Sequence, residues 1–429
     1  MLSRVRLLLG SRYVRNIAAV LGGSAGGQLI VLASMPVLTR LYAPSSFAIS
    51  QSIGALVVAL SVVACLRYEM ALASGDRDDL GGVVALCLTL LIPAALLAIG
   101  FGAVLGAFGL WRSVRGLSDA AVWALPIGLV FTLLASGGSH LLIRSGGFAA
   151  LARGKLLQAL AFAASALAIG LLAPRSTGVM IADLAGRGAL ALCLCVPAAA
   201  WLRSHAVALH PRALLSLAAK YRRFPLYGVP GGLLNVLGGS FNTLWMLSLF
   251  DAHAAGSYAL VERAVAAPVT LVAASVAQAF QGRLVTHLSE GSAGMADDFL
   301  RLLRVQLALG LALAIGLAAV SPIAFPLVFG GQWDQAGAFA QVFGLYVASS
   351  FVTFPFNIGL VVLGRQKQQL AWELSWFILL NGAWAAAWAL KAPPLTALAL
   401  VTAGGVAANA LFLLRLYRQL RRQDALAAA

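Results

Sequence analysis

The chain contains little charge and very little acid. Only 10% of its 429 residues are charged, and 14 Asp and Glu residues stand against 30 Lys and Arg residues. Hydrophobic residues make up 61% of the sequence. A water-soluble domain of this length has too little interior to bury so much apolar surface. The composition therefore excludes a soluble fold and predicts an integral membrane protein.

Residue types that carry enzymatic and metal chemistry are also scarce. The four cysteines all lie in apolar segments, and their spacing matches no metal-binding or disulfide pattern. Four of the five histidines fall in expected loops or at helix ends, and no glycine-rich loop follows a strand to cradle a phosphate. No expected span pairs carboxylates with obvious catalytic partners. We therefore expect neither an enzyme nor a metal or other cofactor.

Long apolar runs fill most of the chain instead. Twelve segments are each long enough to cross a bilayer, which takes about 20 apolar residues at 1.5 Å per residue. Backbone polar groups in lipid must be satisfied within the segment, so these crossings are expected to be helices. The sequence predicts an all-α membrane protein with spans near residues 17–39, 46–66, 80–108, 119–143, 151–172, 178–201, 224–249, 255–281, 303–329, 336–363, 369–390 and 395–417.

The positions of the basic residues predict the orientation of these spans. With both termini in the cytoplasm, 23 of the 30 Lys and Arg residues lie inside and 5 lie outside. This bias is the positive-inside pattern of a multi-pass membrane protein. It also accounts for the net charge of +16. That charge favours anionic lipid headgroups over nucleic acid, because no soluble domain is available to bind a nucleic acid.

The longest connection divides the chain into two sets of six spans. Residues 203–223 read RSHAVALHPRALLSLAAKYRR, a basic and amphipathic sequence. We expect an N-terminal lobe at 1–202, a cytoplasmic linker at 203–223, and a C-terminal lobe with a basic tail at 224–429. The halves are weakly similar around residues 41–50 and 249–260, and such duplication is common in transporters.

Charged residues inside the spans are candidate site residues, because each is costly in lipid and tends to face a partner or a cavity. Asp183 and Arg187 lie four residues apart and share a helix face. They form either a self-neutralising packing pair or a cavity cation with its carboxylate. Glu262 and Arg263 are adjacent, so they point about 100° apart and do not simply neutralise each other.

Further charges lie at the cytoplasmic ends of spans. Arg67 and Glu69 end the second span, where they act either as interfacial anchors or in a site. Arg283 lies at a similar inner mouth. Pro230-Gly231-Gly232 interrupts the seventh span, and a proline there removes a backbone hydrogen bond and bends the helix. This cluster is either a hinge for a conformational change or a static kink.

Three regions of the chain together resemble one transporter family. Residues 36–73 contain a Thr-Arg-Leu-Tyr turn and end near an Arg-Tyr-Glu triplet. Residues 221–235 contain Phe-Pro before the seventh span, and residues 256–284 contain Tyr-Ala-Leu, an arginine, a proline and Gln-Ala-Phe. The third region is 325–343 with 363–370. The set resembles the Wzx-type polysaccharide flippases of the multidrug/oligosaccharidyl-lipid/polysaccharide (MOP) exporter superfamily.

The resemblance implies two six-helix lobes, as in the MOP and MATE transporters, around a central cavity. It implies alternating-access transfer of an undecaprenyl-pyrophosphate-linked oligosaccharide across the bacterial inner membrane. It also implies H⁺ or Na⁺ coupling, with a polysaccharide polymerase and chain-length proteins as partners. Arginine suits the pyrophosphate because its planar fork of donors matches phosphate oxygens. Expected headgroup contacts are Arg67, Arg187, Arg263 and Arg283; expected coupling or charge-balancing residues are Glu69, Asp183 and Glu262.

Other functions remain as alternatives. A drug antiporter of the same fold favours an acidic cavity, whereas residues 17–39 contain no carboxylate. The peptidoglycan lipid flippases have two further helices. A membrane glycan polymerase or ligase usually needs a large outer loop, and every outer connection here is short. Residues 75–82 (GDRDDLGG) are similar to a loop of the major facilitator family but lack its following arginine pair. A membrane scaffold with a blocked or apolar cavity is the last alternative.

Overall fold

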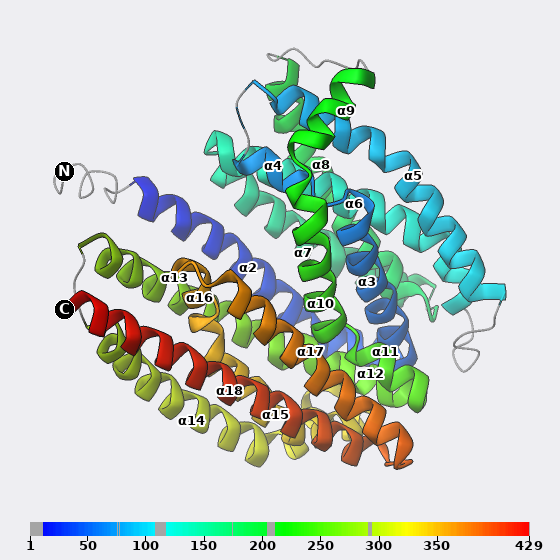
Figure 1. The fold of residues 1–429 in the computed structure, drawn as a ribbon. Coiled ribbons are helices and arrows are strands. Elements are labelled where there is room, and N and C mark those ends of the chain that lie inside the picture. The colour runs from blue at the N-terminus through cyan, green and yellow to red at the C-terminus, as the bar shows by residue number, and fades with distance from the viewer. Residues whose placement is uncertain are drawn as a thin grey trace. The chain divides into compact units, whose positions relative to one another are not determined.

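The computed structural model describes residues 12–74, 76, 78–107, 117–173, 175–203, 211–290 and 294–428. Within these ranges every regular element is a helix (Figure 1). The helices form two compact units, Met1–Leu244 and Trp245–Ala429. The all-helical expectation is therefore confirmed.

Nine helical segments among the described residues are long and apolar enough to cross a membrane. All nine coincide with expected spans, and most boundaries agree within a turn of helix. The chain is thus a multi-pass membrane protein. The nine consist of α3 (Pro44–Ala64), α5 (Leu80–Ala107), α6 (Leu117–Ser145), α7 (Phe148–Leu172), α8 (Gly178–Arg203), α12 (Ala252–Val261) continuing into α13 (Ala267–Glu290), α14 (Met295–Phe329), α15 (Asp334–Thr353) with its flanking 3₁₀ turns (Gly331–Trp333 and Phe354–Phe356), and α18 (Pro394–Ala428).

The three other expected spans are less regular or less apolar. Two of them are long helices, α2 (Arg12–Leu41) and α17 (Gln366–Ala389), in which glycine, serine and amide side chains dilute the apolar residues. The third, 224–249, is divided into a π-helical turn (Phe224–Gly228), α10 (Val229–Gly239) and α11 (Asn242–Leu249). Prolines and glycines weaken α-helix hydrogen bonding along this stretch. The number of twelve crossings remains a prediction.

Short helices connect the long ones. The connections contain α4 (Glu69–Ser74), α9 (Pro211–Lys220) and α16 (Gly359–Val362). A second π-helical turn, Glu262–Ala266, joins α12 to α13 without breaking the helix. The π-helical turns are of interest because such turns are frequent at functional sites.

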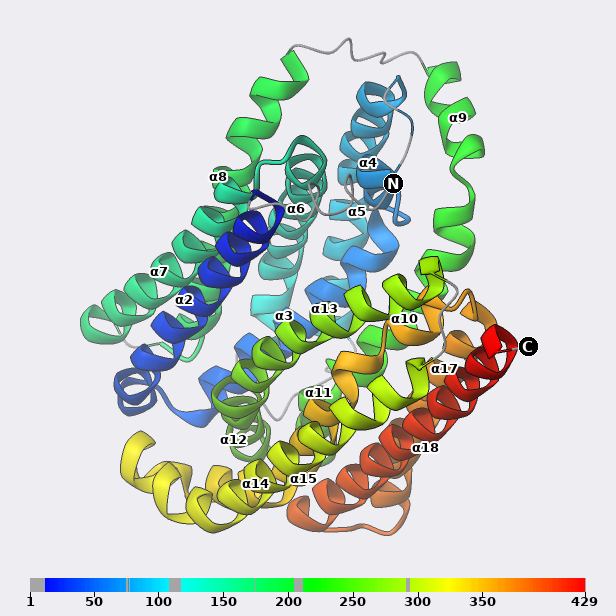
Figure 2. The ribbon, with the colours of Figure 1, turned by 90° about the vertical axis from the view of Figure 1, so that its left-hand side faces the viewer.

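Small residues let the helices of the first unit approach closely. A Cβ added at Gly23 of α2 would lie 2.6 Å from the Cα of Ala152 on α7. One added at Gly186 of α8 would lie 2.8 Å from the carbonyl oxygen of Gln158, also on α7. Figure 2 shows α2, α7 and α8 side by side. Close approach of this kind replaces the hydrophobic effect as the source of helix association in lipid.

An aromatic cluster joins helices of the second unit. The ring of Phe356 lies 4.9 Å from that of Phe280 on α13 and 4.7 Å from that of Phe299 on α14, both edge-on. The ring centroids of Trp372 on α17 and Phe412 on α18 lie 4.6 Å apart. Edge-on aromatic pairs add about 0.5–1.5 kcal/mol each to the burial of their surface. The cluster therefore holds one end of four helices together.

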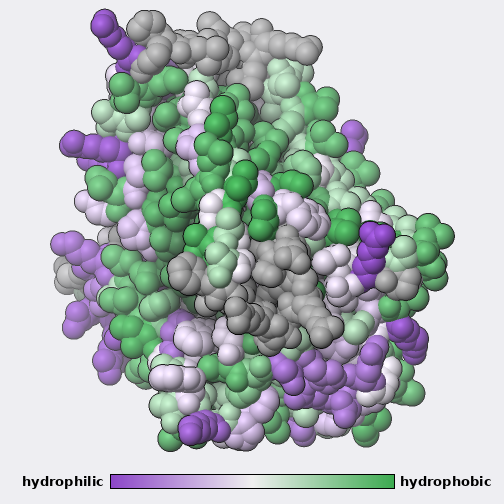
Figure 3. Space-filling model, turned by 90° about the vertical axis from the view of Figure 1, so that its right-hand side faces the viewer, coloured by the Kyte–Doolittle hydropathy of each residue, from purple (hydrophilic) through white to green (hydrophobic). Residues whose placement is uncertain are grey.

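The outer surface carries large apolar side chains. Ile92 and Leu96 of α5 are 70% and 64% exposed, and Ile323 and Leu327 of α14 are 72% and 74% exposed. Figure 3 shows apolar side chains over much of one face of the molecule. Contiguous apolar surface of this extent is unfavourable in water and is suited to contact with lipid chains.

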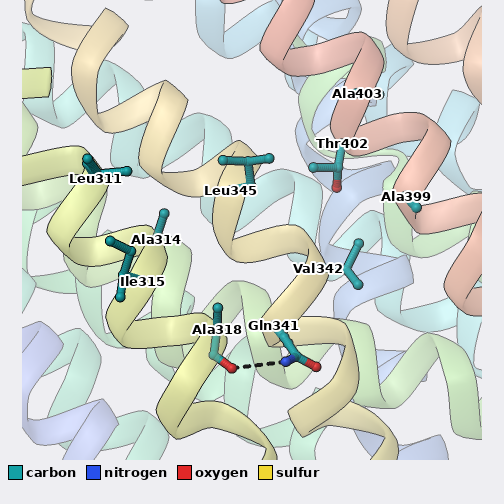
Figure 4. Close-up of a pocket in the computed structure, with 10 residues that line it drawn as sticks. All are labelled: Leu311, Ala314, Ile315, Ala318, Gln341, Val342, Leu345, Ala399, Thr402 and Ala403. Carbon is teal, nitrogen blue, oxygen red and sulfur yellow. Dashed lines mark hydrogen bonds between the residues drawn. The ribbon is translucent and has the colours of Figure 1, made fainter.

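A groove of about 510 Å³ lies between α14, α15 and α18 of the second unit (Figure 4). Alanine, leucine, isoleucine and valine side chains provide most of its lining. Gln341 turns its amide nitrogen to the carbonyl oxygen of Ala318 at 3.0 Å, as Figure 4 shows. This lining offers few polar groups and suits hydrocarbon better than a charged headgroup.

A carboxylate from the end of α18 caps the start of α14. Asp424 accepts hydrogen bonds from the backbone N–H groups of Gly294, Met295 and Ala296 at 2.8–2.9 Å. The first N–H groups of a helix have no partner within the helix, and they attract negative charge. Asp424 therefore connects two helices far apart in the sequence.

We predict that Asp424→Ala destabilises the second unit by about 1–3 kcal/mol, because it leaves these N–H donors without their acceptor. Thermal unfolding of the detergent-solubilised protein should show a lower midpoint. Asp297→Ala is the matched control, since Asp297 is exposed in the same first turn of α14. An equal loss of stability in both variants would contradict the capping role.

Candidate functional site

The turn between α3 and α4 has an unusual backbone conformation. Leu66 and Arg67 have φ angles of 50° and 61°, in the left-handed region that side chains other than glycine rarely adopt. Each such residue costs on the order of 1–3 kcal/mol and persists only where the surroundings enforce it. This turn directs Arg67 toward α10 of the same unit.

Two glycines provide the space for Arg67: Gly228, at the end of the first π-helical turn, and Gly232, in α10. A Cβ added at Gly232 would lie 2.5 Å from Nη2 and 3.0 Å from Nε of Arg67. A Cβ added at Gly228 would lie 3.4 Å from the Cβ and Cγ of Arg67. We call the surface formed by Gly228 and Gly232, against which the Arg67 side chain packs, the Arg67 seat. Gly232 thus has a packing role beside any hinge role of Pro230-Gly231-Gly232, which remains a prediction.

Arg67 is only loosely paired with Glu69. The closest atoms, Nη1 and Oε1, lie 4.0 Å apart. Glu69 is 4% exposed, and its Oε2 and the Nε of Arg67 are buried without a hydrogen-bond partner among the described residues. Burial raises the pKa of the Glu69 carboxyl, and its backbone hydrogen bond and the Arg67 charge oppose this. The pair therefore keeps donor and acceptor capacity for a ligand or a proton.

Lys220 holds the connection between α4 and α5. Its ammonium lies 2.7 Å from a carboxylate oxygen of Asp76 and also donates to Asp79. The hydroxyl of Tyr221 donates to Asp79 at 2.8 Å and accepts from the backbone N–H of Asp76 at 3.1 Å. These contacts lower the pKa of the Asp79 carboxyl and raise that of Lys220. They attach the described end of the linker to the first unit; the expected lobe boundaries remain a prediction.

Asp183 and Arg187 form the pair that their spacing predicts. Nε of Arg187 donates to Oδ2 of Asp183 at 2.8 Å on α8. Nη1 also donates to the hydroxyl of Thr132 on α6 at 3.0 Å. A Cβ at Gly54 of α3 would lie 3.3 Å from Nη2. The pairing is confirmed, while a cavity role for Arg187 remains a prediction.

Glu262 and Arg263 occupy the π-helical turn between α12 and α13. Oε1 of Glu262 accepts a hydrogen bond from the buried hydroxyl of Tyr258 at 3.1 Å. The ring of Tyr258 packs edge-on against Phe343 of α15 at 5.1 Å. Both charged side chains are half-buried, whereas Arg283, farther along α13, is exposed. Headgroup contact by Arg263 and Arg283 remains a prediction.

Several of these partners are not evident from the sequence. Gly228 lies 161 positions from Arg67, and no local pattern links them. The acidic loop of Asp76 and Asp79 belongs to the segment that is similar to a major facilitator loop, and its partner is Lys220. Opposite charges on two expected cytoplasmic connections are the signal that points to this contact. Within the described residues, no group of three metal-ligating side chains is placed to hold an ion.

We predict that Gly232→Ala lowers the thermal midpoint, because its Cβ would collide with the Arg67 guanidinium. Arg67→Ala removes the obstacle, so the double variant should lose less stability than the two single variants summed. Gly137→Ala on α6, where a Cβ meets nothing within 4 Å, is the control. If Gly232→Ala lowers the thermal midpoint just as much when Arg67 is already alanine, the prediction is wrong. The steric clash is then with Val62, the other neighbour of Gly232.

Solved transporters share this fold over nearly the whole chain. An inward-facing multidrug resistance MATE transporter of the MOP superfamily aligns with 96% of this chain and 98% of its own, at 12% identity and a TM-score of 0.64. A eukaryotic MATE transporter aligns with 97% and 100%, at 16% identity and a TM-score of 0.58. A MOP superfamily transporter from Pyrococcus furiosus aligns with 96% of both chains, at 13% identity and a TM-score of 0.57. At such identities the likeness establishes the fold alone.

A sequence family also matches. No curated protein sequence matches the chain. Residues 117–338, just over half of the chain, match the family described as "Polysaccharide biosynthesis protein". The match begins in α6 and ends in α15, so it includes residues of both compact units. The chain therefore belongs to the polysaccharide biosynthesis protein family, and its fold is that of the MOP transporters.

Proposed function

We propose that the protein is an inner-membrane flippase for undecaprenyl-pyrophosphate-linked oligosaccharide repeat units in surface polysaccharide synthesis. The observation that carries the proposal is the coincidence of a polysaccharide biosynthesis family with a MOP transporter fold. A transporter of a polysaccharide precursor must move a large polar headgroup while the lipid tail stays in the bilayer. Both termini lie in the cytoplasm in this proposal.

Arg67 is the strongest candidate for headgroup contact. Its side chain lies against two glycines, with the guanidinium over Gly232, and its Nε lacks a hydrogen-bond partner among the described residues. A pyrophosphate oxygen would satisfy this donor and form a charge-assisted hydrogen bond, stronger than a neutral one. Arg187, Arg263 and Arg283 are the further proposed contacts. Arg187 already donates hydrogen bonds to two partners, so in this proposal it acts mainly through the electrostatic attraction of its positive charge for the headgroup.

Glu69 is the best-supported candidate for coupling to protons. Its buried carboxyl favours the neutral form, and protonation would remove its attraction for Arg67. Arg67 would then be freer to follow the headgroup during alternating access, with α10 flexing at Pro230-Gly231-Gly232. Asp183 and Glu262 are secondary candidates, because each is already held by a neighbouring side chain.

A small-molecule antiporter is the second candidate function. The observation that favours it is the fold, which is shared with multidrug MATE transporters. The polysaccharide family match favours the flippase. The two functions differ in the effect of deleting the gene. Loss of surface polysaccharide supports the flippase, whereas unchanged polysaccharide with drug sensitivity supports the antiporter.

We predict that Arg67→Ala lowers polysaccharide export about tenfold or more at equal abundance, the effect of losing one charged hydrogen-bonding group. Arg67→Lys should retain part of the activity, because lysine keeps the charge but not the planar fork. Surface polysaccharide and the lipid-linked precursor are measured in a strain that lacks the chromosomal gene. Arg40→Ala, at an exposed arginine that ends α2, is the control. Normal export by Arg67→Ala would remove Arg67 from the site.

We predict that Glu69 makes stability fall as pH rises. The folded protein retains the Glu69 proton above the ordinary carboxyl pKa of 4.5, where the unfolded chain has lost it. The free energy of unfolding therefore decreases with pH until Glu69 ionises in the folded state. Glu69→Gln should flatten the dependence of the thermal midpoint on pH in this range. Glu290→Gln, at an exposed glutamate, should leave the dependence unchanged. A slope that persists in Glu69→Gln would assign it to another group.

A further inference from the structure

The segment around the end of the linker exposes an unusual mixture of side chains. Leu215 of α9 is 72% exposed, and Leu226 and Tyr227 of the following π-helical turn are 61% and 76% exposed. Three arginines in the same segment are also exposed. We call this set the linker face; it consists of Arg212, Leu215, Arg222, Arg223, Leu226 and Tyr227.

The opposite side of α9 is attached to the first unit. Leu217 packs on Gly82 of α5, in contact with the position that a Cβ there would take. The hydroxyl of Tyr68 donates to the carbonyl oxygen of Ala218 at 3.1 Å. Lys220 is held by carboxylates, as described above. These contacts fix the orientation of α9, so the exposure of the linker face is a property of the folded unit.

The charge of the linker face has no ion-pair partner in the part of the chain that the structure describes. The sequence contains no acidic residue between Asp183 and Asp251. Asp76 and Asp79, the acids that approach α9, are both engaged by Lys220. Among the described residues, no ion pair involves any of the three arginines of the linker face. The face therefore carries three uncompensated positive charges beside large apolar side chains.

We propose that the linker face lies in the headgroup layer of the cytoplasmic leaflet and binds anionic phospholipid. Arginines bind the phosphates, while leucine and tyrosine enter the boundary between headgroups and acyl chains. The surface of α5, against which α9 packs, continues as exposed apolar side chains at Leu88 and Ile92. The helix that supports α9 therefore itself exposes side chains suited to lipid. Charge complementarity selects an anionic bilayer as the occupant.

Lipid at this face would also act on the Arg67 seat. The π-helical turn carries Leu226 and Tyr227 and ends at Gly228, which contacts Arg67. Anchoring the turn in the headgroup layer therefore restricts the position of the seat. This lipid dependence is independent of which substrate is carried.

The test uses the full-length protein in liposomes. A single cysteine replaces Leu215 in a variant without the four native cysteines, and it carries an environment-sensitive fluorophore. Phosphatidylglycerol or phosphatidylcholine, brominated near the top of the acyl chains, is the quencher. Each arginine near an anionic surface gives roughly fivefold local enrichment of anionic lipid at most. We expect quenching by phosphatidylglycerol to exceed that by phosphatidylcholine several-fold, and high salt to reduce the difference.

Two triple variants decide the origin of this preference. Changing Arg212, Arg222 and Arg223 to Gln should remove it, and changing them to Lys should retain most of it. The matched control changes Arg415, Arg418 and Arg422 of α18 to Gln, which removes the same charge from exposed positions elsewhere. Equal loss in the control would show a general charge effect and overturn the proposal. Equal quenching by both lipids in the labelled protein that keeps all three arginines would also overturn it, whether or not the protein exports polysaccharide.

Discussion

The absence of water in the bilayer is the constraint on which this structure depends. Every backbone N–H and C=O group in lipid needs a partner within the protein, and only the helix supplies one locally. Association between helices then depends on close contact, since lipid chains are as apolar as the side chains. Glycines opposite α7 meet this need in the first unit, and interlocked aromatic rings meet it in the second.

Backbone strain and unpaired polar atoms of charged groups coincide at one turn. Leu66 and Arg67 have left-handed backbones, and Arg67 and Glu69 each bury a polar atom without a partner among the described residues. The charged groups of Arg187 and Lys220, also in the first unit, have hydrogen-bonded acidic partners. Strain and unpaired polar atoms of charged groups that occur together are typical of functional sites. The coincidence is the structural reason to propose a site at Arg67.

The sequence predicts the parts of this protein that depend on local pattern. Apolar length predicts the long helices, and four-residue spacing predicts the Asp183–Arg187 bridge. The Arg67 seat lies beyond such reasoning, because its two sides are more than 150 residues apart and glycine gives no chemical signal. The contact of Lys220 with Asp79 is similarly non-local. Pairing across helices depends on their packing, which composition and periodicity do not specify.

The two π-helical turns have a consequence for comparing related sequences. A π turn holds one residue more than an α turn, so it offsets the following side chains by about 100° from an uninterrupted α-helix. A helical wheel drawn through Glu262–Ala266 therefore assigns wrong faces to one side of the turn. A relative that lacks one residue here would keep a continuous helix, yet present a different stripe of α13 to its neighbours. Alignment gaps at this turn thus record a rotation of the helix surface, not the loss of a loop.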